Sequence, residues 1–416
     1  MAALRGMSER YGRPDWVRRL NAMGESLGDP IEGARRLISL DAGELAATAQ
    51  RSLGRTLSGA FGDPGWRSRF ESLASSADAA PLHVVGRLMT RQELLRGLRT
   101  RCLLDRALAQ KPEIEAERIE APVIVTGPAR SGTSILFELL WLDPTLRGPV
   151  AAEVLHPFPL PEHAGEDRRL AISECEQELW ADVQPEFAAI HELRSDLPVE
   201  CVTLTLPSFC GWHWPMVLQM SGWAPDLAEN YQFHRRILQL LQHAAPRRNW
   251  LLKTPGHLTT LPLVFSLYPD AWVVQTHRDP AKTMPSTVST TAMVQWMRSD
   301  AVDLAATSEG VGAAFCAILN HVAELRGKGG LPDRFVDVHF QSLVRDPVGT
   351  LRAVYQRMGR SFTPEHAERV RSYLAEKPRG KFGVHRYTAE EWGFREASLR
   401  SQLRPYIEAF GVELEE

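Results

Sequence analysis

The chain of 416 residues lacks several features that would indicate a class of partner directly. Its net charge is close to zero, because 48 basic and 51 acidic side chains leave a formal charge of −3. Binding of DNA or RNA relies on summed positive charge, so a nucleic-acid partner is disfavoured. Lysine is also scarce, with six lysines against 42 arginines, a bias that we attribute mostly to genomic base composition.

Cysteines and long apolar runs are few. The five cysteines are scattered, with no CxxC pair and no Cys/His cluster at zinc spacing. This usage is typical of a reducing cytoplasm, where we expect the protein to be located. No stretch approaches the roughly 18 apolar residues of a membrane span, and the charged N-terminal segment is unlike a signal peptide. We therefore expect no transmembrane segment.

The pattern of apolar residues changes near Pro112. Before it, residues such as Leu94, Leu98 and Cys102 recur at helical spacing between arginines, which predicts a helical extension over residues 1–118. After it, short apolar runs alternate with helical stretches, which predicts an α/β domain over 119–416 with a parallel sheet flanked by helices. Its strands are expected at 122–126, 250–252, 271–276 and 335–339.

The segment from Gly127 to Ser134 follows the first expected strand and leads into a helical pattern. A strand, a glycine-rich turn and a helix N-terminus together form a cradle whose N–H groups favour an anion. The spacing is close to the Walker A pattern, but Thr133 stands where its lysine should be, and Arg130 supplies positive charge instead. A plain glycine turn needs no such side chains. The loop therefore predicts a phosphate site made of Arg130, Ser131, Gly132, Thr133 and Ser134.

This loop resembles the 5′-phosphosulfate loop of sulfotransferases that use 3′-phosphoadenosine 5′-phosphosulfate (PAPS). It is most similar to the bacterial branch that also resembles tyrosylprotein sulfotransferases. Further family segments follow in order, although an Arg-Asp pair such as the one at 278–279 is also typical of a plain helix start. The resemblance runs from about residue 120 to the C-terminus, through Leu-Lys-Thr-Pro at 252–255, Arg278 and Ser286, 335–347 and 379–387.

The resemblance implies a P-loop-like sulfotransferase fold and an enzyme of the EC 2.8.2 type. Such an enzyme moves the sulfuryl group of PAPS to an acceptor hydroxyl, or less readily to an amine, without a metal. Arg130 and Lys253 would carry the positive charge at the transferring group. The 3′-phosphate would be held by Arg278, Ser286, Arg379 and Lys381.

Two residues are candidates for the general base. Glu153 lies 23 positions after Arg130, in the region where the resembling enzymes place a glutamate base. His257 follows Lys-Thr-Pro-Gly, whereas the cytosolic animal enzymes have a catalytic His soon after a comparable Lys-Thr. The intervening Pro-Gly alters that geometry, so Glu153 is favoured and the choice stays open.

The segment 206–223 contains three tryptophans and suggests either an apolar acceptor pocket or plain core. We expect a hydrophobic small-molecule or lipid acceptor, while the sequence says nothing of the oligomeric state. A P-loop kinase is the alternative enzyme, favoured by the GxxxxG spacing and opposed by Thr133 and by the lack of an evident acidic magnesium ligand. A non-catalytic nucleotide-binding protein on the same fold is the other alternative.

Overall fold

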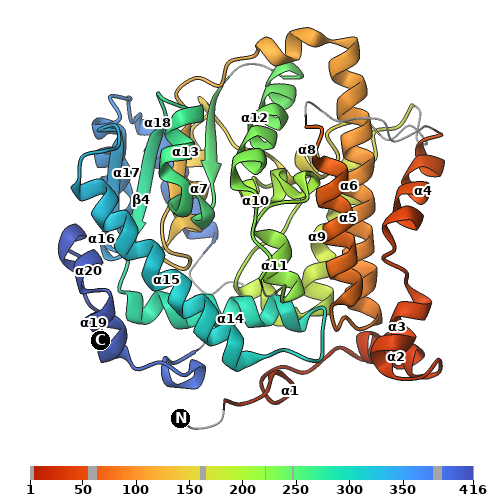
Figure 1. Ribbon diagram of the computed structural model, residues 1–416. Helices are drawn as coiled ribbons and strands as arrows, with labels where there is room; N and C mark the ends of the chain where they lie inside the picture. Colours follow the sequence, from red (N-terminus) through yellow and green to blue (C-terminus); the bar gives the residue numbers. More distant parts are fainter. Residues whose placement is uncertain are drawn as a thin grey trace.

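A parallel sheet of five strands, in the order β2-β3-β1-β4-β5, forms the centre of the computed structural model (Figure 1). The structure describes residues 4–54, 63–159, 165–220, 222–245, 248–377 and 387–415. The four expected strands are confirmed, and a two-residue edge strand, too short to read as a periodic run, is added. The strands are β1 (Val123–Thr126), β2 (Leu146–Arg147), β3 (Asn249–Lys253), β4 (Trp272–His277) and β5 (Phe335–His339).

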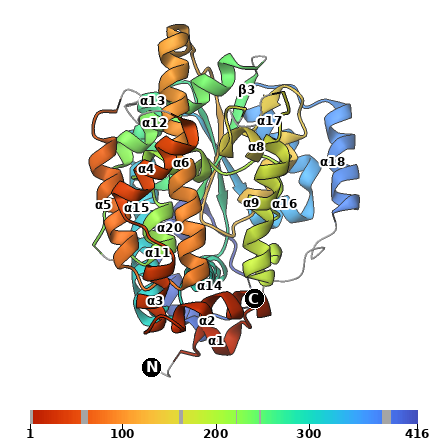
Figure 2. The same cartoon turned by 90° about the vertical axis from the view of Figure 1, so that its right-hand side faces the viewer.

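Both faces of the sheet are covered by helices, as Figure 2 shows. Val123 and Val125 of β1 are buried in one apolar cluster and Ile124 in another, because successive side chains of a strand point to opposite faces. Burial on both faces explains why the strands read as continuous apolar runs. The first face packs against α7 (Thr133–Trp141), α16 (Phe340–Arg345), α17 (Pro347–Arg357) and α18 (Pro364–Glu376), the second against α12 (Leu227–His243), α13 (Leu261–Leu267), α15 (Leu304–Gly327) and α20 (Arg404–Phe410).

The predicted helical N-terminal region is present, and it shares its core with later parts of the chain. Most of its buried apolar side chains lie in one cluster with Trp214, Met293 and Met297. A Cβ at Gly86 would lie 2.0 Å from the carbonyl oxygen of Arg298, so the long helix α6 needs glycine at this contact. The domain boundary at residue 118 stays a prediction. The helices are α1 (Met7–Arg10), α2 (Asp15–Glu25), α3 (Pro30–Leu37), α4 (Ala42–Leu53), α5 (Trp66–Ala79), α6 (Val84–Gln110) and the short η1 (Pro112–Ala116).

The remaining elements connect these layers. None of the helices in the described ranges combines the length with the hydropathy that crossing a bilayer takes. These connecting elements are α8 (Ala151–Leu155), α9 (Arg169–Val183), η3 (Pro185–Ala189), α10 (Cys201–Leu204), η4 (Leu206–Ser208), α11 (His213–Leu218), η5 (Pro255–Thr260), α14 (Pro280–Trp296), η6 (Glu390–Trp392) and α19 (Glu396–Gln402).

Candidate active site

The loop between β1 and α7 makes a tight turn at the carboxyl end of the central strand. Gly127 and Gly132 have φ angles of 145° and 91°, and a Cβ at Gly127 would lie 2.1 Å from Thr276 Oγ1. Ser131 Oγ lies 2.5 Å from both the Pro128 carbonyl and Thr276 Oγ1, which fastens the loop to β4. The hydroxyl of Ser131 therefore braces the loop, and its backbone follows the path of an anion cradle.

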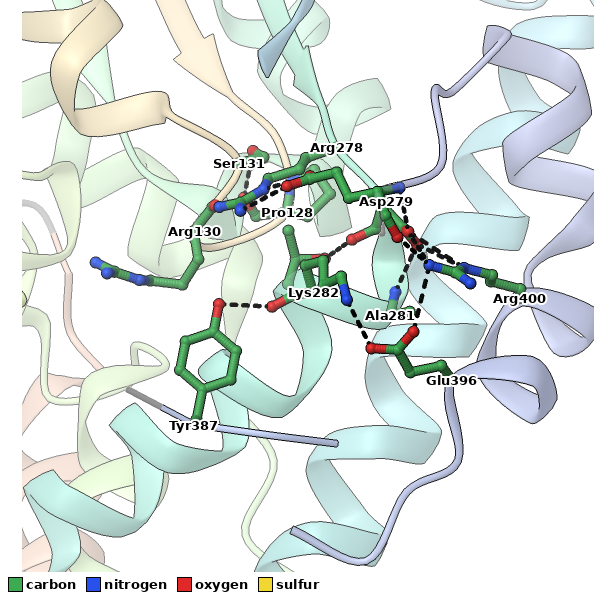
Figure 3. A network of polar contacts seen from close by, with 12 residues as sticks. Pro128, Arg130, Ser131, Arg278, Asp279, Ala281, Lys282, Tyr387, Glu396 and Arg400 are labelled. Atoms are coloured by element: carbon green, nitrogen blue, oxygen red, sulfur yellow. Dashed lines mark hydrogen bonds and ion pairs between the residues drawn. The ribbon is translucent and has the colours of Figure 1, made fainter. Parts of the chain in front are cut away.

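Arg130 also has a positive φ, 68°, which is uncommon for a residue with a side chain. In Figure 3 its guanidinium points away from Arg278. It donates to the Ile190 carbonyl at 3.4 Å. Burial, opposed by Tyr387, lowers the pKa of Arg130. Within the described residues no carboxylate lies within ion-pair distance of this guanidinium, so a half-buried positive charge stands beside the loop.

Lys253, at the end of β3, joins the loop to a carboxylate. The side chain is buried, and its Nζ donates to Ser134 Oγ at 2.9 Å and to Glu200 Oε1 at 2.5 Å. Glu200 also accepts a hydrogen bond from Thr254 Oγ1 at 3.3 Å. Burial acts to raise the pKa of Glu200, but the charge of Lys253 and the hydrogen bonds from Lys253 and Thr254 outweigh it, and the pKa is lowered. The carboxylate of Glu200 is therefore ionised at neutral pH.

Arg278 follows β4 and lies against the same loop. Its Nη1 donates to the carbonyl of Arg130 at 3.0 Å, and the guanidinium lies 4.0 Å from the centre of the Phe340 ring. A Cβ at Gly132 would meet Phe340 at 3.0 Å, so this ring connects the loop with Arg278. In the structure the planar fork of Arg278 holds Glu415, with contacts of 2.7 and 2.9 Å.

Figure 3 shows how the segment after Arg278 is held in place. Asp279 caps α14 by accepting from Ala281 N at 2.9 Å, and it also accepts from Arg400 and from the backbone N–H of Glu415. Ser286 lies on α14 at the expected spacing, fully buried, and its hydroxyl has no partner in the described part of the chain. Arg379 and Lys381 lie outside the described residues.

A cavity of about 870 Å³ begins at Ser134, Lys253 and Glu200 and is lined mainly by apolar side chains. Its walls come from distant parts of the sequence, including Met89 of the N-terminal helix α6. Burial lowers the pKa of His191, another lining residue, to about 4, so its ring is neutral at pH 7. Further apolar lining residues are Leu155, Leu179, Trp180, Phe187, Val202 and Leu206.

The two candidate bases do not line this cavity. Glu153 accepts a hydrogen bond from Arg147 at 3.0 Å, and Arg147 pairs in the sheet with Trp250, near the start of β3 and away from Lys253. His257 is buried, and its Nδ1 shares a hydrogen bond of 2.5 Å with the hydroxyl of Tyr231. Burial and the nearby His234 lower its pKa well below the ordinary value.

The tryptophans of the segment 206–223, for which both an acceptor pocket and plain core were open, do not line the large cavity. Trp214 is fully buried in the core cluster of the N-terminal helices, and neither Trp212 nor Trp214 lines the large cavity. From the segment 206–223, the cavity takes only Leu206 and His213 among the described residues. The apolar walls thus come mainly from α9 and from the chain between it and α10.

Comparison with known proteins places these features in a family. The sequence model of the sulfotransferase family matches residues 122–364, which is more than half of the chain. The chain belongs to the sulfotransferase family. Within it, the chain is 25% identical over 285 residues to the omega-hydroxy-beta-dihydromenaquinone-9 sulfotransferase Stf3 of Mycobacterium tuberculosis and of Mycobacterium bovis, a match that covers 65% of this chain and 71% of Stf3.

Solved structures show the same fold. Sulfotransferase STF9 from Mycobacterium avium superimposes with a TM-score of 0.76 at 24% identity, over 89% of this chain and 97% of that one. Sulfotransferase STF1 from Mycobacterium tuberculosis gives 0.67 at 24% identity, over 86% and 97%. Because these matches extend over most of this sulfotransferase, they include part of its helical N-terminal region as well as the sheet.

Sequence reasoning missed two residues of the cavity in this sulfotransferase. Glu200 stands in a segment without a motif, and only its contact with Lys253, across 53 positions, shows its place. His191 likewise has no distinguishing neighbours in the sequence. The signal that could have suggested Glu200 is weak: an acidic residue directly before an apolar helical turn, at the position where helices favour negative charge.

Proposed function

We propose that this sulfotransferase transfers the sulfuryl group from PAPS to the hydroxyl of a hydrophobic, lipid-like acceptor. The observation that carries the proposal is the position of Lys253. Its buried ammonium touches Ser134 in the anion loop on one side and Glu200 on the other, at the polar end of a large apolar cavity. A cation between an anion cradle and an acceptor pocket is what transfer of a negatively charged group requires.

The polar groups around the loop fit the donor. Arg130 offers a charge without a carboxylate partner in the described chain, and the buried hydroxyl of Ser286 has no partner there either. Arg278 presents a planar fork that already binds a carboxylate in two contacts, which is the geometry that also suits a phosphate. We assign Arg130 and the loop to the 5′ end of the donor, and Arg278 and Ser286 to its 3′-phosphate. PAPS supplies the activated sulfuryl group and the leaving phosphate.

For the acceptor proton we propose Glu200 in place of Glu153. Glu200 lines the cavity in which the acceptor would lie, whereas Glu153 is paired with Arg147 outside it. While Glu200 is paired with Lys253 its carboxylate is a weak base, because the lysine lowers its pKa. Once Lys253 turns to a bound anion, Glu200 loses this partner and becomes more basic.

The acceptor class follows from the cavity walls. Apolar side chains such as Leu179, Phe187 and Leu206 favour a long hydrocarbon next to the reacting hydroxyl. The related Stf3 carries the name of an omega-hydroxylated menaquinone, a lipid with a terminal hydroxyl, which agrees with this class. The acceptor itself stays unnamed.

The test is transfer of ³⁵S from labelled PAPS to a series of primary alcohols of increasing chain length. We expect transfer to rise with chain length and Lys253→Ala to lower kcat by about 10²–10³-fold, as for other groups that stabilise developing charge. Lys328→Ala is the matched control, because that lysine is exposed and pairs with Glu324 one helical turn away. Lack of transfer to any alcohol by the folded wild-type protein would contradict the proposal.

The same assay separates the two carboxylates. We expect Glu200→Gln to lose at least about 10²-fold in kcat, the lower end of what general base catalysis contributes. Glu153→Gln should retain wild-type kcat. The reverse pattern would return the role of base to Glu153.

A further inference from the structure

A second, smaller cavity is lined by Cys201 and Thr254, the residues that follow Glu200 and Lys253 in the chain. Its volume is about 40 Å³, which is enough for a water molecule or a single ion. Cys201, His234 and His257 line it, and their side chains are 3%, 2% and 1% exposed. The sulfuryl transfer proposed above assigns no role to these three side chains.

The three side chains converge on one point. One ligand atom of each, the thiol sulfur or a ring nitrogen, lies within 4.8 Å of the other two. The two imidazole rings stand nearly perpendicular, at 81°, with centres 6.0 Å apart. Zinc bonds of about 2.1 Å to nitrogen and about 2.3 Å to sulfur would place tetrahedral ligands about 3.5 Å apart. Closing the set by about 1 Å would therefore complete such a site.

Both histidines are held by tyrosines at one nitrogen and are unpartnered at the other. His257 Nδ1 pairs with the Tyr231 hydroxyl at 2.5 Å, and His234 Nδ1 pairs with the Tyr268 hydroxyl at 2.9 Å. The Nε2 atoms of both rings are buried and have no hydrogen-bond partner among the described residues. A buried polar nitrogen without a partner is costly.

This arrangement is the one that metal-binding histidines show, with a second hydrogen bond that fixes the ring and leaves the other nitrogen free to coordinate. We propose that Cys201, His234 and His257 form a zinc site. Zinc commonly takes three protein ligands of this kind and keeps a water in the fourth position. Blue copper sites use a similar set with an added methionine, and no methionine lines the described cavity.

The site joins three elements that carry the catalytic pair. Cys201 opens α10 directly after Glu200, His257 lies in η5 four positions after Lys253, and His234 lies on α12. A metal ion would thus fix the two segments from which Lys253 and Glu200 extend. With three protein ligands the site is of the open type, and we assign the ion the role of positioning these two segments. Exposed Trp212 also lines the cavity, which gives an ion a path from solvent.

The test uses the untagged, full-length protein after removal of metals with a chelator, without nucleotide. Cobalt(II) reports a thiolate ligand by an intense charge-transfer band, so we expect that band to saturate at one cobalt per chain. Zinc should displace the cobalt and raise the Tm. Cys201→Ser should abolish the band and weaken zinc binding by about 100-fold or more, beyond what the loss of an outer hydrogen bond costs.

Two further variants keep the outcome clear. Tyr268→Phe leaves all three ligands in place but removes the partner of His234, so zinc should bind about 10–100-fold more weakly. Cys316→Ser, a free cysteine away from the cluster, should bind like wild type. A wild-type protein that gives no thiolate band, or a Cys201→Ser protein that keeps it, would overturn the site, as would copper in place of zinc in the purified protein. Metal binding is measured without PAPS or an acceptor, so these results stand whether or not the ³⁵S assay shows transfer.

Discussion

Glu415 holds the guanidinium that we assign to the 3′-phosphate, so its removal should tighten nucleotide binding. Arg278 donates to both carboxylate oxygens, from Nε at 2.7 Å and from Nη2 at 2.9 Å. A bound phosphate would have to displace this carboxylate and would also meet its negative charge. Glu415→Gln keeps the size of the side chain and removes the charge.

The expected size of the effect follows from the burial of the pair. The two side chains are 16% and 15% exposed, so the pair is stronger than a surface ion pair, which contributes less than about 1 kcal/mol. Hydrogen bonds between charged groups contribute about 1.5–3 kcal/mol each where they are well buried. For this partly exposed pair we take about 1.5 kcal/mol as the free energy that a bound phosphate must overcome to displace Glu415. This corresponds to about a tenfold change in the affinity for the nucleotide.

The assay is calorimetric titration with adenosine 3′,5′-bisphosphate at fixed ionic strength. We expect Glu415→Gln to lower the Kd about tenfold relative to wild type. Glu413→Gln is the matched control, because Glu413 pairs with Arg345 at the exposed surface, 3.2 Å apart. A Kd for Glu415→Gln within twofold of wild type, with an unchanged Tm, would refute the assignment of Arg278 to the phosphate.

Three other predictions concern stability and the acceptor cavity. Glu93→Gln leaves the fully buried Arg298 without its counter-charge and should lower the free energy of unfolding by about 3–5 kcal/mol in urea titrations. Glu44→Gln, the control at an exposed ion pair, should lower it by less than about 1 kcal/mol. Burial acts to raise the pKa of Glu93, but Arg298 and His213 outweigh it and hold the pKa well below the ordinary value. The stabilisation by Glu93 is therefore present above about pH 4.3 and is lost as the pH falls below that value. Below this pH the free energy of unfolding should fall more steeply for wild type than for Glu93→Gln. Parallel plots of the free energy of unfolding against pH would contradict this. Leu179→Trp should raise KM for long alcohols about tenfold and leave short alcohols and nucleotide binding unchanged; equal effects on all alcohols would exclude Leu179 from the acceptor path.

The sheet could be predicted from sequence because its central strands are buried on both faces. Segments such as Val123–Thr126 and Trp272–His277 read as apolar runs for that reason, and the glycine-rich turn after the first strand marks where it ends. The edge strand Leu146–Arg147 could not be found, since two residues carry no periodicity. The packing of α6 as one wall of the cavity depends on contacts that span the whole chain.

The site was predictable where its residues follow strands. Lys253 ends a strand, Arg278 directly follows one, and Arg130 lies four positions after one. Parallel strands bring such ends together. Glu200 could not be predicted, because its position depends on a contact between remote segments rather than on a local sequence pattern. The cluster of Cys201, His234 and His257 could not be predicted for the same reason, since its members are far apart in sequence and lie on separate elements.

The identity of the nucleotide that the loop and Arg278 bind decides whether this site takes PAPS. The decisive measurement is titration of the wild-type protein with adenosine 3′,5′-bisphosphate without metal and with ATP plus magnesium, repeated with Arg278→Ala. We predict that the bisphosphate binds the wild type without metal, that it binds more tightly than ATP with magnesium, and that Arg278→Ala weakens it by about 100-fold, since a charge-assisted contact of about 3 kcal/mol is lost. A preference for ATP with magnesium, or an unchanged Kd in Arg278→Ala, would contradict the assignment of this site to PAPS.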